Sequence, residues 1–226
     1  MFESFVRAIE LIVSDDPLLR EIVLRSIVVS GVAVILSSCW SIPLSAAIAS
    51  KKFMGKEALK TVFAALIGLP TVALGLVLYL LFSNSGYLGF FNLLYTPAGL
   101  AIGQAILITP LICSFSISAI ESVDKDVRAL ASTLGANGVQ TSFAVFRESL
   151  PGIVLSVVSG FNRAIGELGV AQMVGGNIRH DTSVMTTFIA QETQRGEIEM
   201  SIALTIILLF IVLLITATTM MARRRI

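Results

Sequence analysis

The sequence predicts an all-α membrane protein with five transmembrane helices. Three observations support this class. The 226-residue chain is 55% hydrophobic and only 14% charged, whereas roughly a quarter of the residues of a soluble domain are charged. Its mean hydropathy is +0.90. Its apolar residues also form long blocks, each matching the roughly 20 residues that a helix needs to cross a bilayer core about 30 Å thick.

Five blocks are long enough to span the membrane, and we expect one bundle domain over residues 1–226. Three blocks contain a proline in their interior, which a bundle tolerates because neighbouring helices and hydroxyl groups can satisfy the freed carbonyls. Thr71 and Thr109 stand beside two of these prolines and could do this. The predicted spans are 26–49, 61–82, 98–120, 151–174 and 200–221.

The distribution of lysine and arginine predicts the orientation. The link 51–60 holds four lysines, and residues 223–225 are all arginine. In contrast, 83–97 carries no charge and 175–199 has more acids than arginines. We therefore expect an external N-terminus, a cytoplasmic C-terminus and an external loop at 175–199.

The first 20 residues carry apolar side chains at near-helical spacing, with acidic residues between them. This pattern predicts an amphipathic helix on the outer surface rather than a sixth span. A basic segment, a short apolar run and a small-residue cleavage site are missing, so no cleaved signal peptide is expected.

Several functions are disfavoured by composition. A net charge of +1 offers no basic face for nucleic acid. The single histidine, His180, predicts a solvated loop residue and leaves no metal cluster or catalytic pair. Cys39 and Cys113 are expected to be free, buried thiols. Gly55-Lys56 lacks the other residues of a Walker A loop, so we expect this chain to bind no ATP and no other cofactor.

The segment 121–150 is the one sizeable cytoplasmic loop, and it is patterned. Two amphipathic runs are separated by Gly135–Gly138, where glycine and asparagine favour a left-handed turn that ends a helix. The apolar residues are Val127, Leu130, Ala131 and Leu134 in the first run and Val139, Phe143, Phe146 and Leu150 in the second. The pattern predicts two short helices whose apolar face packs either on the protein's own helix ends or on a partner.

The stretch 129–136, followed by Leu150-Pro151-Gly152, resembles the EAA loop of binding-protein-dependent ABC importer permeases of the MetI-like superfamily. The segments 69–75 and 161–178 resemble molybdate and tungstate permeases, and 184–204 resembles tungstate permeases. The likeness covers most of the chain from about Pro43 onward. Ala129 stands where the family usually has glutamate. The residues to which the resemblance assigns a coupling role are Ala129, Leu130, Ala131, Leu134, Gly135 and Ala136.

The resemblance implies a permease subunit of an ABC importer for an oxyanion, with tungstate expected and molybdate as the alternative. It implies a translocation subunit rather than an enzyme, with ATP and Mg²⁺ bound by a separate ATPase. The implied partners are a second copy of the chain, two ATPase subunits, an extracytoplasmic substrate-binding protein and the lipid bilayer. A secondary transporter is a more remote alternative, because no internal repeat is found.

Two charges lie inside the fourth predicted span. Arg163 and Glu167 are four residues apart and can pair on one helical face. Arg163 falls about 18 Å into the span at 1.5 Å per residue, close to the midplane. The favoured interpretation is a neutralised pair that fixes packing in the bundle interior. In the alternative, the pair and Asn162 line the path of a dianion.

At the predicted outer mouth stand Gly175, Gly176 and Asn177. These residues favour the turn that ends a span. The alternative is a nest of backbone amides that binds an oxyanion.

Overall fold

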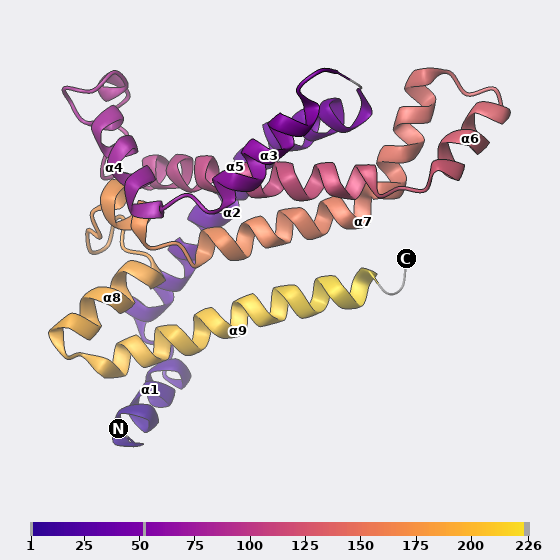
Figure 1. Ribbon diagram of the computed structural model, residues 1–226. Helices are drawn as coiled ribbons and strands as arrows, with labels where there is room; N and C mark the ends of the chain where they lie inside the picture. Colours follow the sequence, from indigo (N-terminus) through magenta and orange to yellow (C-terminus); the bar gives the residue numbers. More distant parts are fainter. Residues whose placement is uncertain (1, 52, 224–226) are drawn as a thin grey trace.

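The computed structural model describes residues 2–51 and 53–223, and the regular elements in these ranges are all helical. Figure 1 shows α5, α7 and α9 extending in a similar direction, while α4 projects away from the bundle. In chain order the helices are α1 (Phe2–Val13), α2 (Pro17–Ser50), α3 (Lys56–Ile67), α4 (Thr71–Phe82), η1 (Gly89–Phe91), α5 (Pro97–Glu121), α6 (Lys125–Thr133), α7 (Gly138–Ile165), η2 (Ala171–Gly175), α8 (Met185–Arg195) and α9 (Ile198–Arg223).

The centre of the bundle is formed by α2, α5 and α7, with α5 packed between the other two. Small residues and hydroxyl groups line these contacts, as expected where helices must approach closely without water. Hydrogen bonds join Ser30 Oγ to Gln104 Oε1 (3.3 Å), Ser37 Oγ to Thr109 Oγ1 (3.0 Å) and Ser116 Oγ to Ser156 Oγ (2.7 Å). These buried polar side chains therefore satisfy one another across the helix interfaces.

Among the described residues, four helices are individually long and apolar enough to cross a membrane, and the pair α3 and α4 makes a fifth if it counts as one span. The third and fifth predicted spans are confirmed by α5 and α9. The first span is longer than predicted, because α2 begins at Pro17. Asp16 fixes this beginning: its side chain accepts hydrogen bonds from the amides of Leu18 (3.0 Å) and Leu19 (2.9 Å).

The prediction of one continuous second span over 61–82 is wrong. The chain bends by 96° between α3 and α4. Gly68 closes α3, with its amide donating to Ala65 O (3.1 Å). Pro70 then has no amide hydrogen and restricts Leu69 to extended conformations, so the helix cannot continue. A new helix starts immediately after it.

The prediction of one continuous fourth span over 151–174 is also wrong. Helix α7 ends at Ile165, and after an interruption at 166–168 the chain resumes as the π-helix η2. The second run of the loop 121–150 is not a separate short helix either, because it forms the beginning of α7. Pro151 lies inside α7 and does not break it.

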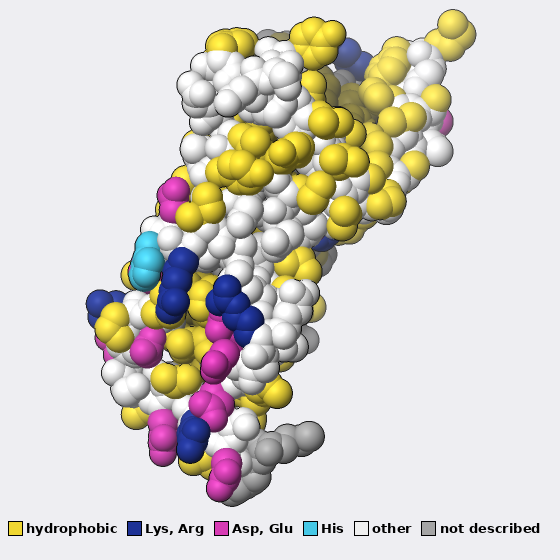
Figure 2. Space-filling model, turned by 90° about the vertical axis from the view of Figure 1, so that its left-hand side faces the viewer, with side chains coloured by type: hydrophobic (Ala, Val, Ile, Leu, Met, Phe, Trp, Pro, Cys, Tyr) yellow, Lys and Arg dark blue, Asp and Glu magenta, His cyan; other side chains and the backbone are white. Residues whose placement is uncertain are grey.

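The external side predicted from the sequence has two further helices. The predicted amphipathic helix near the N-terminus is α1, which packs on α9 with an ion pair between Arg7 Nη1 and Glu199 Oε1 (3.1 Å). Helix α8 was not predicted. Figure 2 shows this side of the molecule, where charged side chains gather over the lower part and the upper part is mainly hydrophobic and uncharged.

Candidate coupling loop and transport path

The loop predicted to mediate coupling is built by helix caps. The Asp124 side chain accepts a hydrogen bond from Asp126 N (3.0 Å) at the beginning of α6. Gly135 follows the helix in the left-handed conformation, with φ of 80°, which glycine adopts without steric strain. Asn137 and Gln140 then form a reciprocal capping box that starts α7. The turn predicted between the two amphipathic runs is therefore present.

Six of the eight apolar residues of this loop divide into two groups. Val127 and Phe146 pack against a cluster formed by the ends of α2, α5 and α7. Four others are exposed, at 62–80% of their possible surface, and we call them the exposed loop surface: Leu130, Leu134, Val139 and Phe143. The face thus packs on the protein's own helix ends through only part of its length.

The remaining residues of the predicted coupling set lie around this surface. Ala129 and Gly135 are exposed, and Ala131 and Ala136 are half-buried. With Leu130 and Leu134, all six come together at the end of α6 and the turn that follows it.

The base of the loop is held by an ion cluster that the sequence did not predict. The Glu121 carboxylate accepts hydrogen bonds from Lys56 Nζ and Lys60 Nζ, both at 2.8 Å. Lys56 also donates to Ala49 O near the end of α2 (3.0 Å). Helices α2, α3 and α5 are therefore joined where the chain leaves α5 for α6.

The charged pair of the fourth span lies where α7 ends. Arg163 Nη1 donates to Glu167, whose other carboxylate oxygen accepts from Val170 N (3.1 Å). The Glu167 side chain is only 2% exposed, whereas that of Arg163 is 33% exposed. The Thr186 hydroxyl donates to Glu167 O (2.7 Å). The carboxylate is therefore fixed at the interruption of the span, and the arginine lies at its edge.

Asn162 faces a different neighbour. Its Nδ2 donates to Thr216 Oγ1 of α9 (2.9 Å). Its Oδ1 is buried without a hydrogen-bond partner in the described chain. The structure thus connects Asn162 to helix packing and does not join it to the Arg163–Glu167 pair.

The amides around the predicted outer mouth are occupied within the chain. Gly176 N donates to Gln172 O (3.1 Å), and Ile178 N donates to Thr182 Oγ1 (3.0 Å). The Asn177 side chain bonds to the α8 residues Gln191 (2.8 Å) and Thr187 (2.7 Å). This geometry favours the span-ending turn over an anion nest, with Gly175 as the last residue of η2.

His180 is exposed, as expected of a loop residue, but it has partners. Its Nδ1 lies 2.9 Å from Glu21 Oε2 in α2. Arg25 pairs with the same carboxylate and donates to Ser183 O (3.2 Å). No local sequence signal could show this contact between residues 159 positions apart. Within the described part of the chain, no three His, Cys, Asp or Glu side chains gather as a metal site.

A bundle of long apolar helices, some of them broken, is typical of an integral membrane protein and is common among transporters. The chain belongs to the family described as binding-protein-dependent transport system inner membrane component, which matches residues 41–226. Its members are the translocation subunits of ABC transporters. Broken helices are also common in secondary transporters, so the family match decides between these classes.

Among the proteins similar to the chain are two curated permeases and one solved structure. The tungstate uptake system permease protein TupB of Peptoclostridium acidaminophilum is 37% identical over 95% of this chain and 94% of that protein. The "Probable anion ABC transporter permease protein" of Haloferax volcanii is 40% identical over 85% of each. A crystal structure of an amino acid ABC transporter superposes with a TM-score of 0.69 and 16% identity, covering 95% of this chain and 97% of that one. The last likeness concerns the fold alone.

Proposed function

We propose that this permease takes up tungstate, powered by ATP hydrolysis on a separate subunit. The observation that carries the substrate is the 37% identity, over nearly the whole length of both chains, to a protein described as a tungstate uptake permease. Molybdate is the alternative oxyanion. The chain itself performs no covalent step in this proposal, and ATP and Mg²⁺ bind to the ATPase.

The proposed assembly contains two copies of this chain, two ATPase subunits and a substrate-binding protein. An ATPase subunit docks on the exposed loop surface. This role is supported by the exposure of its four apolar side chains, which lie outside the predicted spans. The substrate-binding protein docks on the opposite side, over the external loop 175–199.

In the proposed mechanism, the loop transmits movement of the ATPase subunits to the membrane helices. ATP binding draws the two ATPase subunits together, and α6 moves with them. Val127 and Phe146 pack into the same apolar cluster as Leu59 and Phe63 of α3. Movement of the loop is thereby passed to the broken helix pair, the outer side opens to receive the oxyanion, and hydrolysis returns the inward state.

The Arg163–Glu167 pair serves mainly to hold the interruption of the fourth span in place. Burial of Glu167 and its bond to Val170 N support this role. The exposed part of the Arg163 side chain faces the path. Its guanidinium is partly neutralised by Glu167, so it lowers the electrostatic barrier to passage of a dianion without binding the dianion tightly.

The test is ATP hydrolysis by this chain reconstituted in liposomes with its ATPase and binding protein, with tungstate, molybdate and sulfate titrated in parallel. We expect tungstate to stimulate at the lowest concentration. Stronger stimulation by molybdate would move the substrate within the oxyanion class. No stimulation by any of the three, in an assembled complex, would overturn oxyanion import.

A further inference from the structure

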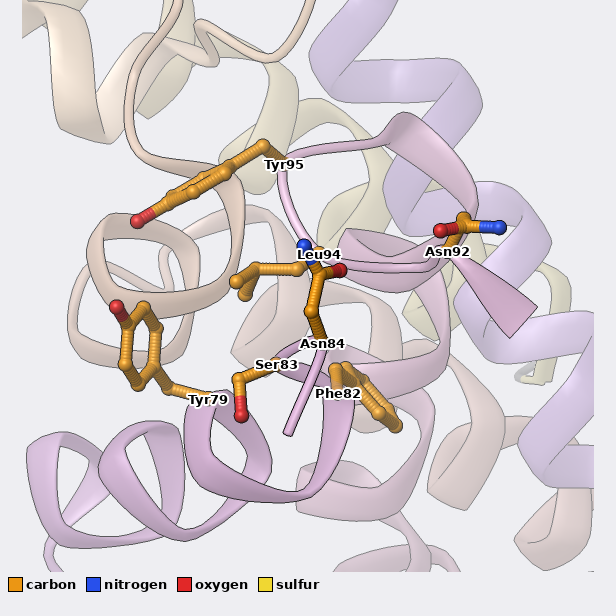
Figure 3. Close-up of a pocket in the computed structure, with 7 residues that line it drawn as sticks. All are labelled: Tyr79, Phe82, Ser83, Asn84, Asn92, Leu94 and Tyr95. Carbon is orange, nitrogen blue, oxygen red and sulfur yellow. The ribbon is translucent and has the colours of Figure 1, made fainter. Parts of the chain in front are cut away.

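A cavity of about 280 Å³ lies at the end of α4, beside the loop that leads to α5. Figure 3 shows the hydroxyl ends of Tyr79 and Tyr95 on the same side of this cavity, with Asn92 placed on the other side. Its lining residues are Tyr79, Phe82, Ser83, Asn84, Asn92, Leu94 and Tyr95. In the predicted orientation this end of α4 faces the outside.

The loop that closes the cavity is held in an unusual conformation. Asn92 and Tyr95 both have positive φ, at 49° and 59°, and a tyrosine rarely adopts this region. Tyr95 N donates to Val174 O (2.9 Å), and its ring lies against Gly176, where a Cβ would come within 2.7 Å of Tyr95 Cδ1. The glycine predicted at the outer mouth therefore positions a cavity residue instead of binding an anion through its own amide.

The cavity presents hydrogen-bond donors that the protein does not use. The side chains of Asn84 and Asn92 are exposed, so their amide groups are open to a ligand, whereas the backbone amide of Asn92 donates to Gly89 O (3.0 Å). Ser83 is different, because its hydroxyl already donates to Leu80 O (2.9 Å). Hydrogen bonding to Tyr79 raises the pKa of Tyr95. This hydrogen bond engages one of the two phenol hydrogens, so the Tyr79–Tyr95 pair keeps one hydroxyl hydrogen for a ligand.

No charge of the surrounding elements opposes an anion. Residues 61–120, which include α4, the loop and all of α5 except its last residue, Glu121, contain no Asp, Glu, Lys or Arg. The segment 168–178, which packs against α4 through η2, is uncharged as well. Hence a dianion in this cavity meets hydroxyl and amide donors without repulsion from a carboxylate, and without a cation that would hold it strongly.

We propose that this cavity is an outer subsite for a tetrahedral oxyanion in transit, bound by the neutral donors of Tyr79, Asn84, Asn92 and Tyr95. This inference rests on the proposed function and on the external placement of the loop. The cavity volume of about 280 Å³ is several times the ~30 Å³ that one water occupies. The cavity therefore has room for the anion together with part of its hydration shell. Weak binding suits a path, because the ion must also leave.

The first experiment measures protection of a cysteine in the cavity. Ser83→Cys, in a Cys39→Ser background, is placed in the assembled transporter in lipid nanodiscs and reacted with a maleimide. We expect millimolar tungstate to slow the reaction, while sodium chloride at equal ionic strength does not. An unchanged rate with tungstate, molybdate and sulfate alike would overturn the subsite.

The donors are tested with variants that remove only hydroxyl groups. In Tyr79→Phe/Tyr95→Phe, half-protection should need about tenfold more tungstate, because hydrogen bonds to charged groups are the stronger class. Tyr87→Phe is the matched control, since Tyr87 is exposed in the same loop and does not line the cavity. Equal protection in the double variant and the control would overturn the assignment of the donors.

The proposed function is tested separately, by stimulation of ATP hydrolysis. Stimulation of the unsubstituted complex by tungstate, combined with no protection at position 83, would refute the subsite and leave the importer intact. Protection without stimulation by any oxyanion would instead refute the proposed function.

Discussion

Arg163 and Glu167 form an ion pair whose two members differ in burial. The Glu167 side chain is 2% exposed and that of Arg163 is 33% exposed. Removing the arginine leaves a buried carboxylate without its partner, which costs about 3–5 kcal/mol for fully buried pairs and less here because Arg163 is partly exposed. We therefore predict that Arg163→Gln lowers the melting temperature more than Arg163→Gln/Glu167→Gln does.

The double variant is the informative comparison. It removes both charges while the amide of the new glutamine can still accept from Val170 N. Melting of the purified protein in detergent can be followed by fluorescence of Trp40, the one tryptophan of the chain. A double variant less stable than the single one would contradict a pair that mainly neutralises itself.

At the scale of elements, α4 crosses the interrupted fourth span with almost no space between the backbones. A Cβ on Gly169 would lie 2.4 Å from Thr71 Oγ1 and 2.8 Å from Val72 N, which is backbone. We predict that Gly169→Ala destabilises the protein by about 1–3 kcal/mol and reduces transport. Gly31→Ala in α2 is the control: nothing lies within 4 Å of its Cβ, and alanine favours a helix interior by roughly 0.5–1 kcal/mol. Equal melting temperatures of the two variants would refute the tight crossing.

The two breaks show how far the sequence could predict these elements. Apolar length locates the long apolar helices, and α5 and α9 match their predicted spans closely. The length of an apolar block does not show whether the helix axis bends within it, however. The helix-ending signals at Gly68-Leu69-Pro70 and Gly166-Glu167 lie inside otherwise apolar blocks. The prolines of α2, α5 and α7 leave their helices unbroken, so a proline alone could not identify the break at Pro70.

The candidate site was predictable where it depends on local pattern. The turn at Gly135 and the amphipathic runs could be read from spacing. The partners of Glu121, Glu21 and Asn177 could not, because each pairs with residues from another element. For the loop itself, pattern left two interpretations of the apolar face open, and only the packing shows that Val127 and Phe146 are covered while Leu130 is exposed.

The exposed loop surface leads to a prediction about coupling. Leu130→Asp places a charge at an exposed position, so the permease should insert and melt normally, but the proposed contact with the ATPase should be lost. We expect transport and copurification of the ATPase to be abolished. Met54→Asp is the matched control, because Met54 is a fully exposed apolar residue of the predicted cytoplasmic link 51–60. Transport that survives in Leu130→Asp would exclude the coupling role of this residue.

At the scale of the whole molecule, the apolar exterior is explained by the lipid that surrounds it. Helix α9 has several large apolar side chains exposed, including Leu209, Phe210 and Leu213. In water such a continuous surface would cause aggregation. In a bilayer it contacts lipid, while helices satisfy their own backbone hydrogen bonds.

The orientation of the whole chain follows from the same arrangement. The Arg7–Glu199 pair places α1 at the beginning of α9. The 26 residues of α9 rise about 39 Å at 1.5 Å per residue, enough to cross a core of about 30 Å. The N-terminus and the loop 175–199 should thus lie on one side of the membrane and the lysine-rich link 51–60 on the other.

Single cysteines in a Cys39→Ser background can test this orientation in intact cells with a membrane-impermeant maleimide. Val13→Cys and Ser85→Cys should react in intact cells, and Met54→Cys should react only after permeabilisation, because lysine-rich links stay in the cytoplasm. The reverse pattern would invert the protein and place the exposed loop surface outside, away from any ATPase. Reaction of Val13→Cys and Ser85→Cys from opposite sides would contradict the span count itself, since an odd number of crossings would then separate positions 13 and 85.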